Sequence, residues 1–266
     1  MHFLAIFSLD EAAMAAPPIV PRGAVASTLK DLLNDPNVDF IEKVSTIYGA
    51  STQKNAPWGL ARISNKLRGK DHTTFTYDES ASEGTCTYVL DTGIEVDHPE
   101  FEGRARFVQY FVDNADLDAN GHGTHIAGTI GSKTGSDGIA VNMSLSAASS
   151  PSINAAARYI VKSGYFLAVA AGNEDTDASH VSPRSNRPER YEPHSPIAVF
   201  LRCQARVRHT STATPHVTGL AAYLLGLKDS KASELCNFIV TMSLKDVIKG
   251  IPEDTVNLLI QNGEAK

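Results

Sequence analysis

The sequence predicts an α/β fold in which a parallel sheet lies between helices. Strand-like and helix-like patterns alternate along the 266 residues, and such alternation is typical of a doubly wound parallel sheet. Polar residues also follow directly on two β-rich runs, "TCTYVLD", which ends at Asp91, and "YFLAVAAGN", which ends at Asn173. Open α/β sheets carry their functional side chains at these carboxyl ends of strands.

The composition argues against two classes of function. The net charge is −6 and the isoelectric point is about 5.8, so no overall basic field attracts phosphates and we expect no nucleic-acid partner. The chain has no run of about 18 apolar residues, so we expect no membrane span. The three cysteines, Cys86, Cys203 and Cys236, lack the CxxC spacing typical of zinc and redox motifs.

The N-terminal segments differ from the rest of the chain. Residues 1–23 are a candidate signal or leader, with an apolar Phe3–Leu9 and small residues at Ala13 and Ala15. Asp10 and Glu11 interrupt that pattern, so its use as a secretory signal stays open. Residues 24–48 indicate a short helix followed by a strand-like segment.

The main domain is predicted to cover residues 51–266. Its first part, 51–83, is polar and rich in turn residues. The segment 183–209 is an atypical insert with six Arg and four Pro. Its composition favours a solvated loop over a basic binding patch.

The stretch "HTSTATPHVTGLAAYLLGL", residues 209–227, begins with Ser and Thr and continues as a helix that is apolar almost all round. Such a helix is buried. Ser211 is then either the N-cap of this helix, which is the common role of Ser at a helix start, or a nucleophile on its first turn. Partners elsewhere in the chain decide between the two.

Those partners are present in the sequence. Asp91 and Asn173 end predicted strands, and His122 lies in a glycine-flanked turn that opens a helix. A Ser nucleophile needs a base, which His supplies near neutral pH. Asp orients the imidazole, and an amide N–H stabilises the oxyanion. The four residues are therefore the parts needed for acyl transfer.

The segments "YVLDTG", "GHGTHIAG", "AVAAGN" and "TSTATPHVTGLAAYL" resemble the four signatures of subtilisin-like serine proteases, in the order that this family uses. "NAPWGLARIS", "HPEFEGRA" and "IPEDTVNLL" look most like the fungal proteinase K-like branch. The resemblance covers residues 51–182 and 210–262, and it implies a subtilisin-like α/β fold and a serine endopeptidase. It assigns Asp91 as orienting acid, His122 as base and Ser211 as nucleophile. The oxyanion donors would be Asn173 and the Ser211 backbone N–H, and the substrate-binding residues Leu145, Ser146 and Ala147.

The same resemblance implies further properties. The segment 24–50 looks like the remnant of an inhibitory propeptide, with the cut near Ala50–Ser51. We expect polypeptide substrates, the chain's own propeptide as a partner, a secreted location and a monomer. No cofactor is needed for the chemistry; the resemblance allows a calcium ion, but the usual ligands of the family's calcium site are largely missing.

The chain departs from the family pattern in several places. Family members have about 50 more residues between Thr134 and Gly135, including a central strand, so we expect an incomplete sheet with unpaired backbone groups. Ser146, Ala147 and Ala148 stand where the family has Gly, which would narrow the specificity pocket. The segment 183–209 replaces several strands. In the nucleophile motif, this chain has His209 where the family has Gly, and Thr212 where the family has Met. The alternative function is therefore a catalytically impaired or inactive remnant, a pseudoenzyme or the product of a truncated gene model.

Other roles remain open for single residues. His122 and His125 have the i, i+3 spacing of metal ligands, but the sequence supplies no clear third ligand and we expect no metal site. "NMS" at Asn142–Ser144 is a glycosylation sequon, although its place beside the substrate cleft in the family favours an unmodified Asn. Cys86 and Cys236 match family disulfide positions whose partners are missing, and pairing of Cys203 with Cys236 is an open guess.

Overall fold

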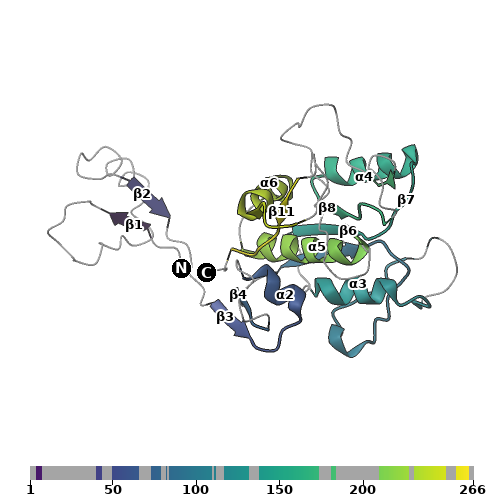
Figure 1. Ribbon diagram of the computed structural model, residues 1–266, viewed down its shortest axis with the longest axis horizontal. Helices are drawn as coiled ribbons and strands as arrows, with labels where there is room; N and C mark the ends of the chain where they lie inside the picture. Colours follow the sequence, from purple (N-terminus) through teal and green to yellow (C-terminus); the bar gives the residue numbers. More distant parts are fainter. Residues whose placement is uncertain are drawn as a thin grey trace. The chain divides into compact units, whose positions relative to one another are not determined.

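The computed structural model describes residues 4–7, 40–43, 50–65, 73–78, 82, 84–109, 111, 117–131, 138–173, 181–183, 210–227, 231–249 and 256–263. The chain divides into two compact units, Met1–Tyr48 and Gly49–Lys266. Figure 1 shows the elements of both units.

The first unit contains an antiparallel pair of strands, β1 (Leu4–Phe7) and β2 (Phe40–Lys43). The strand β2 lies inside the segment predicted to be strand-like, whereas β1 belongs to the candidate leader. The helix expected after residue 24 lies outside the described residues. The boundary between Tyr48 and Gly49 is close to the expected cut at Ala50–Ser51.

A parallel sheet lies at the centre of the second unit. Its described strands are β5 (Thr85–Val89), β6 (Gly138–Met143) and β8 (Phe166–Val169), in the order β5-β6-β8. Both pairings are parallel, so the carboxyl ends of all three strands meet at one edge. The predicted α/β fold is confirmed. The segment that is missing between Thr134 and Gly135 leaves no gap among these strands, because β6 pairs directly with both neighbours.

The alternation of side chains along the strands gives the sheet two apolar faces. Ala140, Phe166 and Ala168 point to a core shared with α5 (Thr210–Leu227) and α6 (Ala232–Met242). The intervening residues Val141, Met143, Leu167 and Val169 form a second core with Ala157 of α4 (Pro151–Lys162). Helix α5 is buried on most sides, as predicted, and Figure 1 shows it crossing the middle of the unit in front of β6.

Helix α3 (His122–Ile130) packs against α5 and β5. Its contact with α5 is close, since a Cβ added at Gly219 of α5 would lie 3.3 Å from the Ile130 carbonyl oxygen. This packing brings the first turn of α3 to the edge where the parallel strands end.

The segment 51–83 is more regular than its turn-rich sequence predicts. It contains α2 (Trp58–Ile63), and β3 (Ala50–Gln53) pairs antiparallel with β4 (Phe75–Asp78). Tertiary contacts explain the difference, because Ile63 is buried in the α5 core and the Tyr223 hydroxyl of α5 accepts the Asp78 N–H at 3.1 Å. The smaller elements are η1 (Pro99–Phe101), the β7–β9 pair (Ala147–Ala148 with Val181–Ser182) and the β10–β11 pair (Leu244–Lys245 with Leu258–Leu259).

Candidate active site

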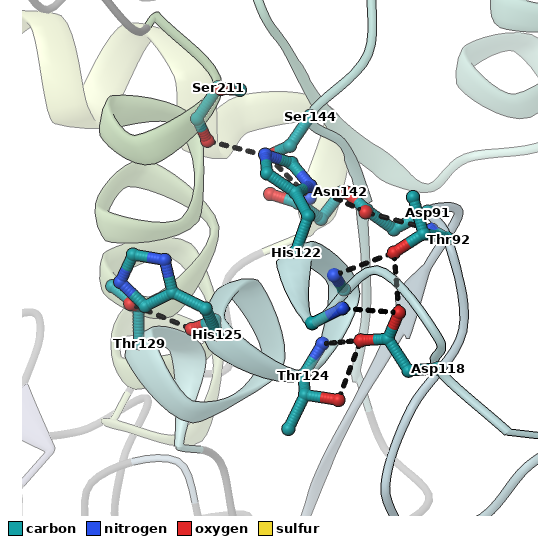
Figure 2. A network of polar contacts seen from close by, with 12 residues as sticks. Asp91, Thr92, Asp118, His122, Thr124, His125, Thr129, Asn142, Ser144 and Ser211 are labelled. Carbon is teal, nitrogen blue, oxygen red and sulfur yellow. Dashed lines mark hydrogen bonds and ion pairs between the residues drawn. The ribbon is translucent and has the colours of Figure 1, made fainter. Parts of the chain in front are cut away.

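The predicted site residues come from five elements that converge at the carboxyl edge of the sheet. Asp91 follows β5 by two residues, Leu145–Ala147 follow β6, and Asn173 follows β8 by four residues. His122 is the first residue of α3, and Ser211 is the second residue of α5. In Figure 2 the His122 ring lies between Asp91 and the first turn of α5.

Asp91 and His122 form a close pair. His122 Nδ1 lies 2.6 Å from Asp91 Oδ1, which also accepts the Thr92 N–H at 2.8 Å. The Asp91 side chain is only 3% exposed, and its Oδ2 has no hydrogen-bond partner among the described residues. A carboxylate accepts hydrogen bonds only, so Nδ1 carries the proton of a neutral His122 ring. The lone pair of Nε2 is then available to take a proton.

A second carboxylate, Asp118, holds the Asp91 turn against the start of α3. Its Oδ1 accepts from Thr92 Oγ1 at 2.7 Å and from the Gly121 N–H at 3.0 Å. Its Oδ2 accepts from the Thr124 N–H at 2.8 Å and from Thr124 Oγ1 at 2.7 Å. Desolvation by burial raises the pKa of Asp118, but the hydrogen bonds from Thr124, Thr92 and Gly121 outweigh it and lower that pKa from 3.8 to about 2. Figure 2 shows this network beside the His122 turn.

The glycine after His122 allows the two turns to approach. A Cβ added at Gly123 would overlap the Gly93 carbonyl oxygen, and it would lie 3.2 Å from Asp91 Cβ. The Gly123 N–H donates to Thr92 Oγ1 at 3.0 Å. The "GHGTH" sequence therefore places a glycine, which has no Cβ, directly after His122, and this lets the His122 ring reach Asp91.

Ser211 lies in the first turn of α5 and is 8% exposed. Helix α5 begins at Thr210, so Ser211 is already helical and the N-cap hypothesis for it is wrong. Among the described residues, no hydrogen bond joins Ser211 Oγ to His122 Nε2. The Ser211 carbonyl accepts a hydrogen bond from Ser144 Oγ at 2.8 Å.

Asn173 is attached to the start of the same helix. Its Oδ1 accepts from the Thr210 N–H at 2.8 Å and from Thr210 Oγ1 at 3.3 Å. Thr210 Oγ1 also lies 2.9 Å from the Gly172 carbonyl oxygen, to which it donates. These contacts occupy the acceptor end of the Asn173 amide at the first residue of α5. The donor end, Nδ2, is the atom that an oxyanion would need.

The three predicted substrate-binding residues differ in their surroundings. Leu145 packs against the apolar core on the α4 face. Ser146 is half-buried, whereas Ala147 and Ala148 are exposed in β7. Strand β7 pairs antiparallel with Val181–Ser182 of β9, which holds this segment at the edge of the site.

Two site residues escaped the sequence prediction, Asp118 and Ser144. Asp118 could have been found from its place four residues before His122, where an acidic side chain reaches the exposed N–H groups of a helix start. For Ser144 the sequence gives only half of a signal: Pro215, four residues after Ser211, indicates that the Ser211 carbonyl lacks a helical donor, but not which residue replaces it. The residue His209, which departs from the family pattern, lies outside the described residues.

The structure bears on the alternative roles of single residues. Asn142 is fully buried and hydrogen-bonded on both sides, which does not suit glycosylation of the folded chain. The described residues hold no group of three or more His, Cys, Asp or Glu side chains that could bind a metal. In the described part of the chain, no helix has the length and apolar character to cross a membrane. Cys203 lies outside the described residues, so its pairing with Cys236 stays a prediction.

Comparison with known proteins identifies relatives of this chain. A profile of the Subtilase family matches residues 82–149. Proteinase T of Parengyodontium album is 39% identical over 293 residues, which cover 85% of this chain and 99% of that protein. The cuticle-degrading protease of Metarhizium anisopliae is 38% identical over 305 residues, covering 88% and 78%. Both alignments are longer than the 266 residues of this chain, so these relatives contain residues that it lacks.

A solved structure agrees with these relatives. The crystal structure of a cold adapted subtilisin-like serine proteinase matches with a TM-score of 0.60 and 25% identity, over 78% of this chain and 98% of that one. The fold and the relatives thus agree with the resemblance carried by the four sequence motifs. This chain belongs to the subtilase family, the subtilisin-like serine endopeptidases.

Proposed function

We propose that this chain hydrolyses peptide bonds through an acyl-enzyme on Ser211, with His122 as general base and Asp91 as orienting acid. The observation that supports this proposal most strongly is the 2.6 Å contact between His122 Nδ1 and the buried Asp91 carboxylate. That contact fixes the tautomer in which Nε2 can take a proton. The family supplies the substrate class, which is polypeptides.

In the first step His122 Nε2 removes the proton from Ser211 Oγ while Oγ attacks the scissile carbonyl carbon. The developing oxyanion would be held by Asn173 Nδ2 and by the Ser211 N–H at the positive end of α5. When the intermediate collapses, the C–N bond breaks and His122 gives its proton to the leaving amine. Water, activated by the same base, then hydrolyses the Ser211 ester and releases the acid.

The chemistry needs no cofactor, because the chain supplies nucleophile, base and oxyanion donors. The substrate cleft would run along Leu145–Ala147, where the paired β7 segment stays exposed. We also propose that the protein acts outside the cell as a monomer.

The test is covalent labelling of the purified full chain with a fluorophosphonate, followed by mass mapping of the adduct. We expect one adduct on Ser211 in the folded wild-type chain and none in the Ser211→Ala variant. The His122→Ala variant should label at least about 10³-fold more slowly, since the base is essential to nucleophile activation. A Ser243→Ala variant, altered at the residue that caps the C-terminal end of α6, should label like wild type.

One observation favours the alternative, a catalytically impaired family member. The described residues lack the hydrogen bond from Ser211 Oγ to His122 Nε2 that an assembled triad uses. Hydrogen bonds at catalytic sites are often long without substrate and tighten on binding. A folded wild-type chain without an adduct on Ser211 would therefore replace the protease proposal with this alternative.

A further inference from the structure

Pro215 lies inside α5, four residues after Ser211. In an α-helix the N–H of residue 215 would donate to the carbonyl of residue 211. Proline has no N–H, so this helical hydrogen bond is missing. The carbonyl that loses its donor belongs to the proposed nucleophile, and Ser211 is 8% exposed. A buried carbonyl without a partner is costly, so another group should satisfy it.

Ser144 supplies the missing donor. Its hydroxyl, which follows β6 at the carboxyl edge of the sheet, donates to the Ser211 carbonyl at 2.8 Å. Ser144 is 4% exposed, so water does not compete for this contact. A hydroxyl has one proton, and in this arrangement the proton of Ser144 is directed at α5.

Two further buried side chains fix that direction. Asn142 Nδ2 donates to Ser144 Oγ at 2.9 Å, so the Ser144 oxygen acts as acceptor on this side and keeps its proton for Ser211. Thr218 Oγ1 donates to Asn142 Oδ1 at 2.9 Å and thereby fixes the Asn142 amide. Asn142 and Thr218 are both 0% exposed. The chain of contacts leaves α5 at Ser211, crosses to β6 and returns to α5 at Thr218, and Figure 2 shows its part around Ser211.

We propose that Ser144 is a positioning residue for the nucleophile: it replaces the helical donor that Pro215 lacks and so fixes the first turn of α5, which carries Ser211. The proposal rests on the proposed acyl-enzyme function. Ser144 takes no proton from the substrate and touches no reacting atom. Its effect is on the angle and distance at which Ser211 Oγ meets His122 and the scissile carbon.

A double-mutant cycle on Ser144 and Pro215 tests the proposal. Ser144→Ala removes the donor, whereas Pro215→Ala restores the helical N–H to the same carbonyl. We expect Ser144→Ala to lower the rate constant of fluorophosphonate labelling at Ser211 by at least about tenfold. In peptide hydrolysis, kcat should fall by a similar factor while KM changes little. In the Pro215→Ala background the same substitution should cost less than about threefold, because the carbonyl then has a backbone donor.

Ser243→Ala is the matched control. Ser243 Oγ is also buried and also donates to a carbonyl, that of Ile239 at 2.7 Å, but this carbonyl keeps a helical donor in the Ser243 N–H at 3.0 Å. The labelling rate of the control should stay unchanged, and its loss of thermal stability should be smaller than that of Ser144→Ala because the Ile239 carbonyl keeps a donor. Equal loss of labelling in both variants would show a purely structural effect and overturn the proposal.

Two other results decide the question. If Ser144→Ala labels at the wild-type rate, or loses the same factor with and without Pro215, Ser144 does not position the nucleophile. Amide hydrogen exchange over residues 212–218 tests the arrangement without catalysis: Ser144→Ala should speed it, and the double variant should restore it. If the variants show this exchange pattern but the wild-type chain never labels at Ser211, the proposed function is contradicted and the hydrogen-bond arrangement is still supported.

Discussion

Single residues set the geometry of this site mostly through close contacts. The glycines of α3 show the difference between a residue that must be glycine and one that need not be. A Cβ at Gly123 would overlap the Gly93 carbonyl oxygen next to Asp91, whereas a Cβ at Gly128 would meet nothing within 4 Å. The two positions lie on the same helix, so they form a matched pair of substitutions.

We predict opposite outcomes for these two glycines. Gly123→Ala should push α3 away from the Asp91 turn, lengthen the contact between His122 and Asp91, and lower kcat/KM by about 10²-fold, as expected when a catalytic group moves by about 1 Å. Gly128→Ala should keep activity and raise the free energy of unfolding by about 0.5–1 kcal/mol, because Ala is the better helix former. Peptide hydrolysis and urea unfolding measure the two effects. Equal activity in both variants would contradict the close-contact argument.

At the scale of elements, α5 is the part on which the others depend. It carries Ser211, it covers one face of the sheet, and its His216 packs against Gly59 of α2. His216 Nδ1 lies 3.0 Å from the Thr212 carbonyl oxygen of the same helix. Burial lowers the pKa of His216 below its usual 6.5, the hydrogen bond to Thr212 raises it, and the charge of His125 on α3 lowers it further.

This lowered pKa predicts acid sensitivity of the α5 packing. The folded state binds the His216 proton more weakly than the unfolded state, so the contribution to stability is complete above pH 6.5 and is lost as the pH falls below it. In a Ser211→Ala background, which prevents self-cleavage, His216→Leu should flatten the fall in unfolding free energy between pH 7 and pH 5. His98→Gln, on the separate η1 turn, should keep the fall. An unchanged pH profile in His216→Leu would show that another group causes it.

At the scale of the whole molecule, the sequence predicted the α/β class, the burial of α5, and the places of Asp91 and Asn173 after strands. These follow from short-range patterns: apolar runs that end in Asp91 or Asn173, and Ser and Thr before an apolar helix. It did not predict β3, α2 and β4, because these polar elements are held by tertiary contacts such as that between Asp78 and Tyr223. Ser144 was missed for a similar reason, since its partner carbonyl is 67 residues away.

The division of the chain after Tyr48 leads to a prediction about maturation. The expected cut between Ala50 and Ser51 lies at the first bond of β3, where Ala50 pairs with Asp78 and Ser51 with Tyr77. After cleavage there, Ala50 leaves β4, whereas Ser51–Gln53 can keep their partners. If the chain is an active protease, the purified wild type should convert to a product with Ser51 at its N-terminus, and Ser211→Ala should stay at 28.5 kDa. N-terminal sequencing and intact mass measure both. Wild-type protein added in trace to Ser211→Ala should produce the same new N-terminus, whereas an uncut wild-type chain that still labels at Ser211 would show that activity does not need this cleavage.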